Sequence, residues 1–192
     1  METETIRLAR KKITDYNETI IKIIETQDSS LNSIQQYMTC YTTISNVSGR
    51  ERGEDNQAIK LFNDFVSFYI TRMFKNKFEE KKEQDFLEGF IVEWNNFKMF
   101  LFILKNIFYK IDKFFLEKRT IGSYTLVSSA LDIMKNNFFT KNCKKINEVI
   151  GKIIEEERNE EKINSNLLLN IINVKLYIVI YVAIIIYIFI LF

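Results

Sequence analysis

The 192-residue sequence contains no proline and no histidine, and it has only five glycines. Proline and glycine are the residues that most often interrupt regular structure, so their scarcity predicts long helices. The absence of histidine removes the side chain most often used for acid–base catalysis and metal binding near neutral pH. The Ser128-Ser129 pair therefore lacks the base that would activate a serine nucleophile. This composition favours a non-catalytic protein that needs no metal or other cofactor.

The net charge and the number of cysteines are also low. The net charge is +2, from 27 basic and 25 acidic residues, so the chain lacks the excess of positive charge that holds nucleic acid. The two cysteines, Cys40 and Cys143, are far apart and lack the spacing of a zinc site, so we expect free thiols in a reducing compartment. The N-terminal sequence METETIRLARKK has no apolar segment of the kind found in secretory signals. These features predict a cytoplasmic or nuclear protein that does not bind nucleic acid.

Apolar residues recur at helical spacing in the first half of the chain. Three helices are predicted there, over residues 6–24, 30–47 and 57–78. Ser30 is a suitable N-cap for the second helix, whereas the charged, glycine-containing run Ser48–Asn56 predicts a solvated loop. The stretch Lys75–Gln84 is almost entirely charged and predicts an exposed turn or helix end. The residues of the third helix that we expect to face inward are Leu61, Phe65, Phe68 and either Ile70 or Met73.

The second half carries the strongest periodicity. From Phe86 to Phe115, large apolar residues recur at steps of three or four without a miss, which predicts one continuous helix about 45 Å long. Two further helices are predicted over residues 123–139 and 144–158. Strand-like alternation is absent throughout, so the fold class is all-α.

One stretch of the second predicted helix, YMTCYTTISN, carries no charge. Its pattern Tyr37-Met38-x-x-Tyr41-Thr42-x-Ile44-x-Asn46 resembles the second helix of the first cullin repeat. The similarity continues in register through three later segments, which are Phe86-Leu87 to Trp94-Asn95-Asn96-Phe97, then Lys110-Ile111-Asp112-Lys113, and finally Ile154 to Asn164. Departures from the family pattern include Glu160 in place of glycine and Met134 in place of tryptophan. The resemblance spans most of Thr26 to Asn173.

The resemblance implies a fold, which is a five-helix cullin-repeat bundle with a long central helix, a partial sixth helix and a hydrophobic C-terminal helix. It also implies a domain organisation. We expect an N-terminal helix over residues 1–25, a first cullin repeat over 26–142, the start of a second repeat over 143–173 and a hydrophobic tail over 174–192.

The resemblance further implies a non-catalytic scaffold in a ubiquitin ligase complex, which acts in ubiquitin-dependent protein degradation. In cullins, the second and fifth helices of the first repeat dock an adaptor of the Skp or BTB fold. An uncharged face with aromatic side chains suits such an interface. The expected adaptor-binding residues are Tyr37, Met38, Tyr41, Ile44, Asn46, Tyr124 and Leu131. Because the RING-binding half of cullins has no counterpart in this sequence, no RING partner is expected. Packing within the core is the competing interpretation for each of these residues.

The tail LYIVIYVAIIIYIFILF, Leu176–Phe192, has no charged residue and is at the short limit of a membrane span. Three explanations remain open. The tail could be a membrane anchor, which would make the chain a tail-anchored helical membrane protein with no ubiquitin role. It could instead be a buried helix of an incomplete second repeat, or the translation of non-coding, A/T-rich sequence that begins near Val174-Lys175.

Overall fold

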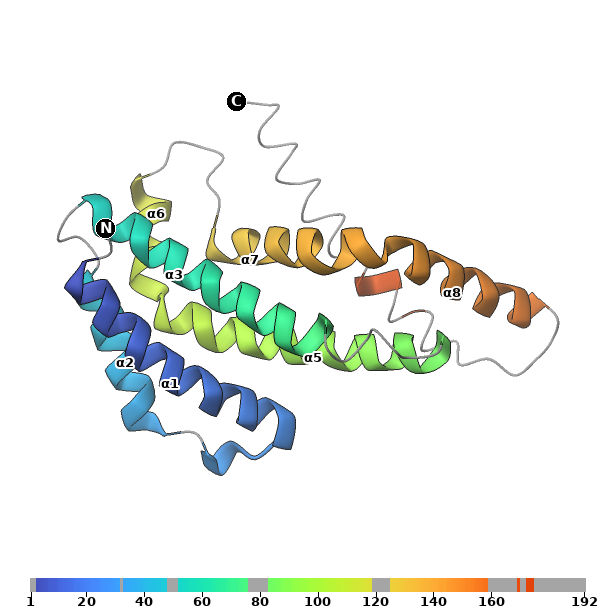
Figure 1. Cartoon of the computed structure of the whole chain (residues 1–192), viewed down its shortest axis with the longest axis horizontal. Coiled ribbons are helices and arrows are strands. Elements are labelled where there is room, and N and C mark those ends of the chain that lie inside the picture. Colours follow the sequence, from blue (N-terminus) through green and yellow to red (C-terminus); the bar gives the residue numbers. More distant parts are fainter. Residues whose placement is uncertain are drawn as a thin grey trace. The chain divides into compact units, whose positions relative to one another are not determined.

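The computed structural model describes residues 3–31, 33–47, 52–75, 83–118, 125–158, 169 and 172–174, and every regular element among them is helical (Figure 1). This confirms the all-α fold class. The α-helices are α1 (Glu4–Thr26), α2 (Ile34–Val47), α3 (Arg52–Ile70), α5 (Glu83–Ile107), α6 (Tyr109–Lys118), α7 (Leu126–Met134) and α8 (Thr140–Arg158). Three short elements complete the order: the 3₁₀-helix η1 (Ser29–Leu31) and the π-helices η2 (Thr71–Lys75) and η3 (Lys135–Phe139).

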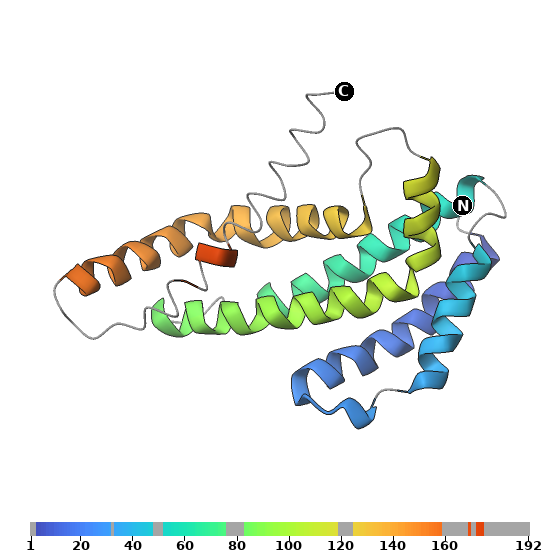
Figure 2. The same cartoon turned by 180° about the vertical axis from the view of Figure 1, so that it is seen from behind.

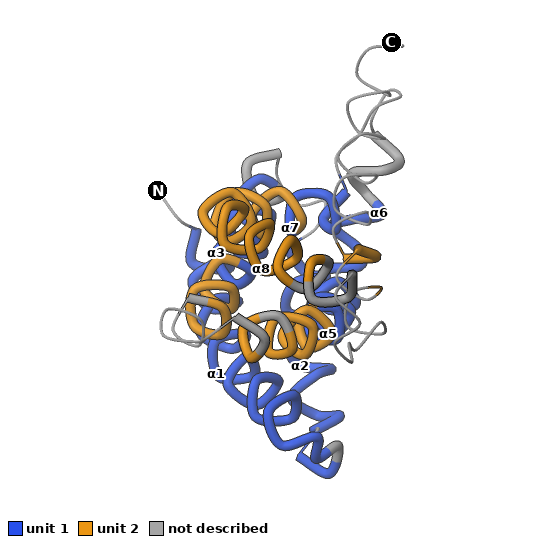
Figure 3. The backbone as a smooth tube through the Cα atoms, turned by 90° about the vertical axis from the view of Figure 1, so that its right-hand side faces the viewer, with its two compact units in different colours: residues 1–66, 98–130 blue, residues 67–97, 131–192 orange. Residues whose placement is uncertain are grey.

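The chain forms two compact units (Figure 3). Unit 1 comprises Met1–Val66 and Lys98–Ala130, and unit 2 comprises Ser67–Phe97 and Leu131–Phe192. The boundary between them falls inside α3, α5 and α7, so each of these helices contributes residues to both units.

In unit 1, α1 and α2 form an antiparallel pair joined by a short polar connection (Figure 1). Thr3 caps α1 by accepting a hydrogen bond from the Ile6 amide at 3.4 Å, and Gln27 ends the helix with a left-handed φ of 56°. Asp28 then accepts hydrogen bonds from both the amide and the hydroxyl of Ser30, which lowers the pKa of its carboxyl group. The predicted end of the first helix is therefore confirmed. Ser30 belongs to this turn and does not cap α2, so its assignment as N-cap was wrong.

The apolar face of α1 supplies much of the core of unit 1. Ile13, Ile20 and Ile24 are buried, as the helical spacing of the sequence predicts. Polar contacts tie α1 to α3 at the edge of this core. The Gln57 side chain accepts a hydrogen bond from the Thr3 amide at 3.0 Å, and Arg10 forms an ion pair with Asp64 at 3.1 Å.

The end of α5 in unit 1 departs from the sequence prediction. The expected continuous helix is interrupted at Phe108, after which α6 follows a different direction (Figure 2). Phe108 is fully buried, with its ring edge-on to that of Phe62 at 5.4 Å. Ile107 and Ile111 on either side are also buried. The apolar periodicity continues across the bend because it follows the buried face, while the helix axis changes direction.

The start of α7 in unit 1 is held by two sets of hydrogen bonds. Thr125 and Ser128 form a reciprocal capping box, in which the Thr125 hydroxyl accepts from the Ser128 amide at 3.1 Å and the Ser128 hydroxyl accepts from the Thr125 amide at 2.7 Å. Asp112, which is only 5% exposed, accepts a hydrogen bond from the Leu126 amide at 2.9 Å. These contacts begin the helix three residues later than the predicted boundary at Ser123.

Unit 2 has an aromatic core. The rings of Phe74 in η2 and Phe138 in η3 are 4.9 Å apart, and Phe138 stacks on Phe90 of α5 at 5.5 Å with an interplanar angle of 3°. Trp94 packs against Phe97 at 5.9 Å. The two π-helical turns thus place their phenylalanines against each other. The helical path continues from α7 through η3 into α8 without a break, so the predicted gap between residues 139 and 144 is absent.

Two further predictions need correction. Residues 52–56 belong to α3 and not to a solvated loop, and residues 48–51 lie outside the described part of the chain. Phe68 is 45% exposed, because the buried stripe steps by four residues from Phe65 to Tyr69. Leu61, Phe65, Ile70 and Met73 are buried as predicted.

The hydrophobic tail Leu176–Phe192 and most of the charged run Lys75–Gln84 lie outside the described residues. Among the residues that are described, no helix is both long and apolar enough to cross a membrane.

Candidate protein-docking surface

The start of α2 is set by Ser33, whose hydroxyl accepts a hydrogen bond from the Gln36 amide at 3.2 Å. The buried side of the helix consists of Cys40, Thr43, Ile44 and Val47. The Lys12 ammonium group donates a hydrogen bond to the Thr43 hydroxyl at 3.3 Å, which links this buried side to α1. These contacts orient α2 so that Cys40, Thr43, Ile44 and Val47 face the core.

Next to this buried side, α2 and the turn before it carry an apolar face, which we define as Leu31, Ile34, Tyr37, Met38 and Tyr41. Leu31, Ile34 and Met38 are 42%, 77% and 47% exposed. The rings of Tyr37 and Tyr41 are half-buried and stack on each other, with centroids 6.4 Å apart. The helix from Ile34 to Val47 contains no charged residue.

The structure brings together three of the seven predicted site residues, namely Tyr37, Met38 and Tyr41. Asn46 is exposed, but it follows Tyr41 by five residues and therefore lies about 140° away around the helix. Ile44 is fully buried, since it is four residues after Cys40 and three before Val47, on the core side of α2. Its placement on the exposed face was wrong.

Of the two residues predicted from the fifth helix, only Leu131 is among the described residues. Leu131 is only 3% exposed, so its assignment to an exposed surface was also wrong. Tyr124 lies outside the described residues.

Leu31 and Ile34 were absent from the predicted site. The signal that could have found them is their spacing: Leu31, Ile34, Met38 and Tyr41 follow one another at steps of three or four residues.

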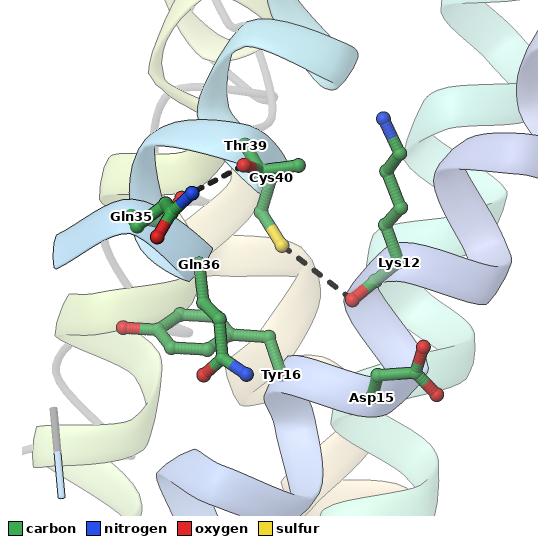
Figure 4. Close-up of a pocket in the computed structure, with 7 residues that line it drawn as sticks. All are labelled: Lys12, Asp15, Tyr16, Gln35, Gln36, Thr39 and Cys40. Atoms are coloured by element: carbon green, nitrogen blue, oxygen red, sulfur yellow. Dashed lines mark hydrogen bonds between the residues drawn. The ribbon is translucent and has the colours of Figure 1, made fainter. Parts of the chain in front are cut away.

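A cleft of about 270 Å³ opens between α1 and α2 (Figure 4). Its lining residues are Lys12, Asp15 and Tyr16 from α1, and Gln35, Gln36, Thr39 and Cys40 from α2. The Cys40 thiol donates a hydrogen bond to the Lys12 carbonyl oxygen at 3.5 Å. Burial raises the pKa of Cys40 to about 11 and that of Tyr16 to about 12, so both groups stay protonated at neutral pH. The cleft therefore offers no thiolate that could act as a nucleophile or bind a metal ion.

The part of the chain that the structure describes contains no cluster of three or more Cys, Asp or Glu side chains that could hold a metal ion. Cys143 is an exposed free thiol and Cys40 a buried one. A helical chain with an uncharged apolar face has the character of a scaffold that binds other proteins.

Comparison with known protein families agrees with the interpretation of the chain as a scaffold. The cullin alpha solenoid domain matches residues 13–181, which is most of the chain. The chain therefore belongs to the cullin family, and the matched region is a non-catalytic scaffold domain. The resemblance predicted from the Tyr37-Met38 motif and the later segments is thus confirmed.

Two relatives show how distant the similarity is. Cullin-1 of Oryza sativa subsp. japonica is 25% identical over 154 residues, which cover 79% of this chain and 20% of the rice protein. A cullin-like protein 2 of Arabidopsis thaliana is 21% identical over 155 residues, which cover 81% of this chain and 41% of that protein. The chain thus spans a minor part of the length of these relatives.

Proposed function

We propose that this chain is a scaffold module of a ubiquitin ligase complex that docks an adaptor of the Skp or BTB fold through the apolar face of α2. Membership of the cullin family supports the scaffold role. The stacked pair Tyr37–Tyr41 beside the exposed Met38 is the observation on which the location rests. The free thiols Cys40 and Cys143 are compatible with a cytoplasmic or nuclear place of action.

The chemistry of the face suits a stable contact between proteins. Aromatic residues and methionine are enriched at the desolvated centre of protein interfaces, and charged residues are depleted there. Tyr37 and Tyr41 present rigid rings that lose little conformational entropy when a partner covers them. Because the two rings already stack on each other, they are held in place before the partner arrives. The same face lacks any group that could perform chemistry on the adaptor.

A binding measurement with a purified Skp-type adaptor tests the proposal. Such an adaptor is the first choice because the Tyr37-Met38-x-x-Tyr41-Thr42 run is most similar to cullins that use it. We expect Tyr41→Ala to weaken binding by about 10-fold or more, and Tyr41→Asp to abolish it, since a carboxylate would be desolvated without a partner charge. A BTB-fold adaptor measured in parallel separates the two adaptor classes.

Gln36→Asp provides the matched control. Gln36 is an exposed residue of the same helix and lies about 140° away from Tyr41 around the helix. This variant introduces the same charge away from the apolar face, so we expect binding within about threefold of the parent chain. Equal binding by the parent, Tyr41→Asp and Gln36→Asp chains, or no binding of either adaptor class by the parent, would contradict the proposal.

A further inference from the structure

Ile34 has the highest exposed fraction, 77%, of the large apolar side chains in the described part of the chain. It is the first residue of α2 and directly follows the capping residue Ser33. An isolated exposed apolar side chain is ordinary on a protein surface. Ile34 is not isolated, however, because Met38, at 47% exposure, follows it by one helical turn, and Leu31, at 42% exposure, precedes it by three residues in the sequence.

These side chains continue the tyrosine-bearing surface toward the N-terminus of α2. Ile34, Met38 and Tyr41 are spaced four and three residues apart, so they form one stripe along the helix. Leu31, an exposed apolar residue of the preceding 3₁₀ turn, comes three residues before Ile34 in the sequence. Exposed apolar residues therefore continue beyond the Tyr37-Met38 motif from which the docking site was inferred.

The charge pattern of α2 restricts what could cover this extension. From Ile34 to Val47 the helix offers no cation or anion that could pair with a charge on a partner. A charged group placed over Ile34 would lose its hydration without gaining a counter-charge, which is costly. The complementary surface is therefore apolar and uncharged at this position.

We propose that the docked adaptor presents an apolar, uncharged groove that extends over Leu31 and Ile34, with Ile34 as the anchor of the N-terminal part of the interface. The inference rests on the proposed function and deepens it by naming an additional specificity-determining residue and the chemistry of the surface that receives it. The adaptor is the occupant because Met38 and Tyr41 belong to the same stripe, so a partner that covers the tyrosines lies directly beside Ile34.

The experiment compares Ile34→Ser with Gln35→Ser in the full chain, using the Skp-type and BTB-fold adaptors in separate binding titrations. Gln35 is also exposed, is the next residue of α2 and lies about 100° around the helix from Ile34. Both variants gain the same residue at neighbouring positions in the first turn, so they affect the helix itself in a similar way. We expect Ile34→Ser to raise the Kd by about 10- to 30-fold and Gln35→Ser by less than about threefold.

Two further measurements test the absence of charge in the groove. We expect Ile34→Asp and Ile34→Lys to weaken binding to a similar extent, because either charge would be desolvated in an apolar groove. We also expect the Kd of the parent chain to change by less than about threefold between about 50 mM and about 500 mM NaCl, because screening has little to act on. Strong weakening by one charge and tight binding by the other would overturn the uncharged groove.

The outcomes separate this inference from the proposed function. If the parent chain binds an adaptor and Tyr41→Asp does not, but Ile34→Ser matches Gln35→Ser, the docking role stands and the extension over Ile34 is wrong. If the parent chain binds neither adaptor, both proposals fail. A second copy of this chain is the alternative occupant of the apolar face, and sedimentation of the parent and Ile34→Ser chains tests it. If the parent chain is a dimer and Ile34→Ser is a monomer, the face belongs to the dimer contact and the inference is overturned.

Discussion

Removal of the Asp112 carboxylate should destabilise the chain through the start of α7. Asp112 is only 5% exposed and accepts a hydrogen bond from the Leu126 amide at 2.9 Å. A hydrogen bond to a charged group contributes about 1.5–3 kcal/mol to stability, and this one also satisfies an amide at a helix start, where intrahelical partners are missing. We expect Asp112→Ala to lower the free energy of unfolding by about 2–3 kcal/mol.

Asp112→Asn separates the hydrogen bond from the charge. Asparagine keeps an acceptor of similar size but loses the negative charge, which interacts favourably with the positive end of the α7 dipole. We expect it to cost about 0.5–1.5 kcal/mol, between the parent chain and Asp112→Ala.

Urea unfolding followed by circular dichroism measures these differences, with an unchanged denaturant slope as the condition for comparison. Asp15→Ala is the control, because Asp15 is exposed in the middle of α1 and its removal should change stability by less than about 0.5 kcal/mol. Hydrogen exchange at the Leu126 amide provides a local readout, since its protection should fall in Asp112→Ala. A loss in Asp112→Ala no larger than that in Asp15→Ala would refute the role of the carboxylate.

Three further predictions follow from the packing of single side chains. Ellman's reagent at pH 8 should modify the exposed Cys143 rapidly and Cys40 only in denaturant, because Cys40 is buried with a pKa of about 11; rapid reaction of both thiols would contradict its burial. Because burial keeps Cys40 neutral, its contribution to stability is complete below pH 9 and is lost as the pH rises toward 11. The free energy of unfolding should therefore fall less steeply between pH 9 and pH 11 in Cys40→Ala than in the parent chain. Equal slopes of the free energy of unfolding against pH in the two chains would rule this out. Phe138→Ala should cost about 3–5 kcal/mol, whereas Phe102→Ala, at a position 67% exposed, should cost less than about 1 kcal/mol; similar losses in thermal unfolding would be incompatible with the aromatic core.

The helices could be predicted from sequence because their signals are local. The apolar spacing of α1 and the polar run after Thr26 predicted both the helix and its end. The bend at Phe108 could not be predicted in this way, because periodicity reports which face is buried and not the direction of the axis. The extension of α3 over residues 52–56 was missed because glycine and alternating charge are also found in exposed helix starts.

The docking surface was predicted only in part, for a related reason. The motif around Tyr37 and Tyr41 indicated the correct helix, but a motif groups residues by order and not by angle around the axis. Ile44 therefore proved to be buried, while Ile34, outside the motif, proved to be exposed. How far a side chain is covered depends on the helices packed against it, which are distant in sequence.

Because η3 is a π-helical turn, the number of residues around Phe138 determines how α8 is rotated about its axis. A π turn holds about one residue more than an α turn, so deletion of one residue from Lys135–Phe139 would restore regular α-helix and rotate α8 by about 100° relative to the preceding helix. Ile146 and Val149, each 4% exposed, would turn away from their present neighbours. An insertion or deletion of a single residue here would consequently change which side of α8 is buried, although the composition of the helix would be almost the same.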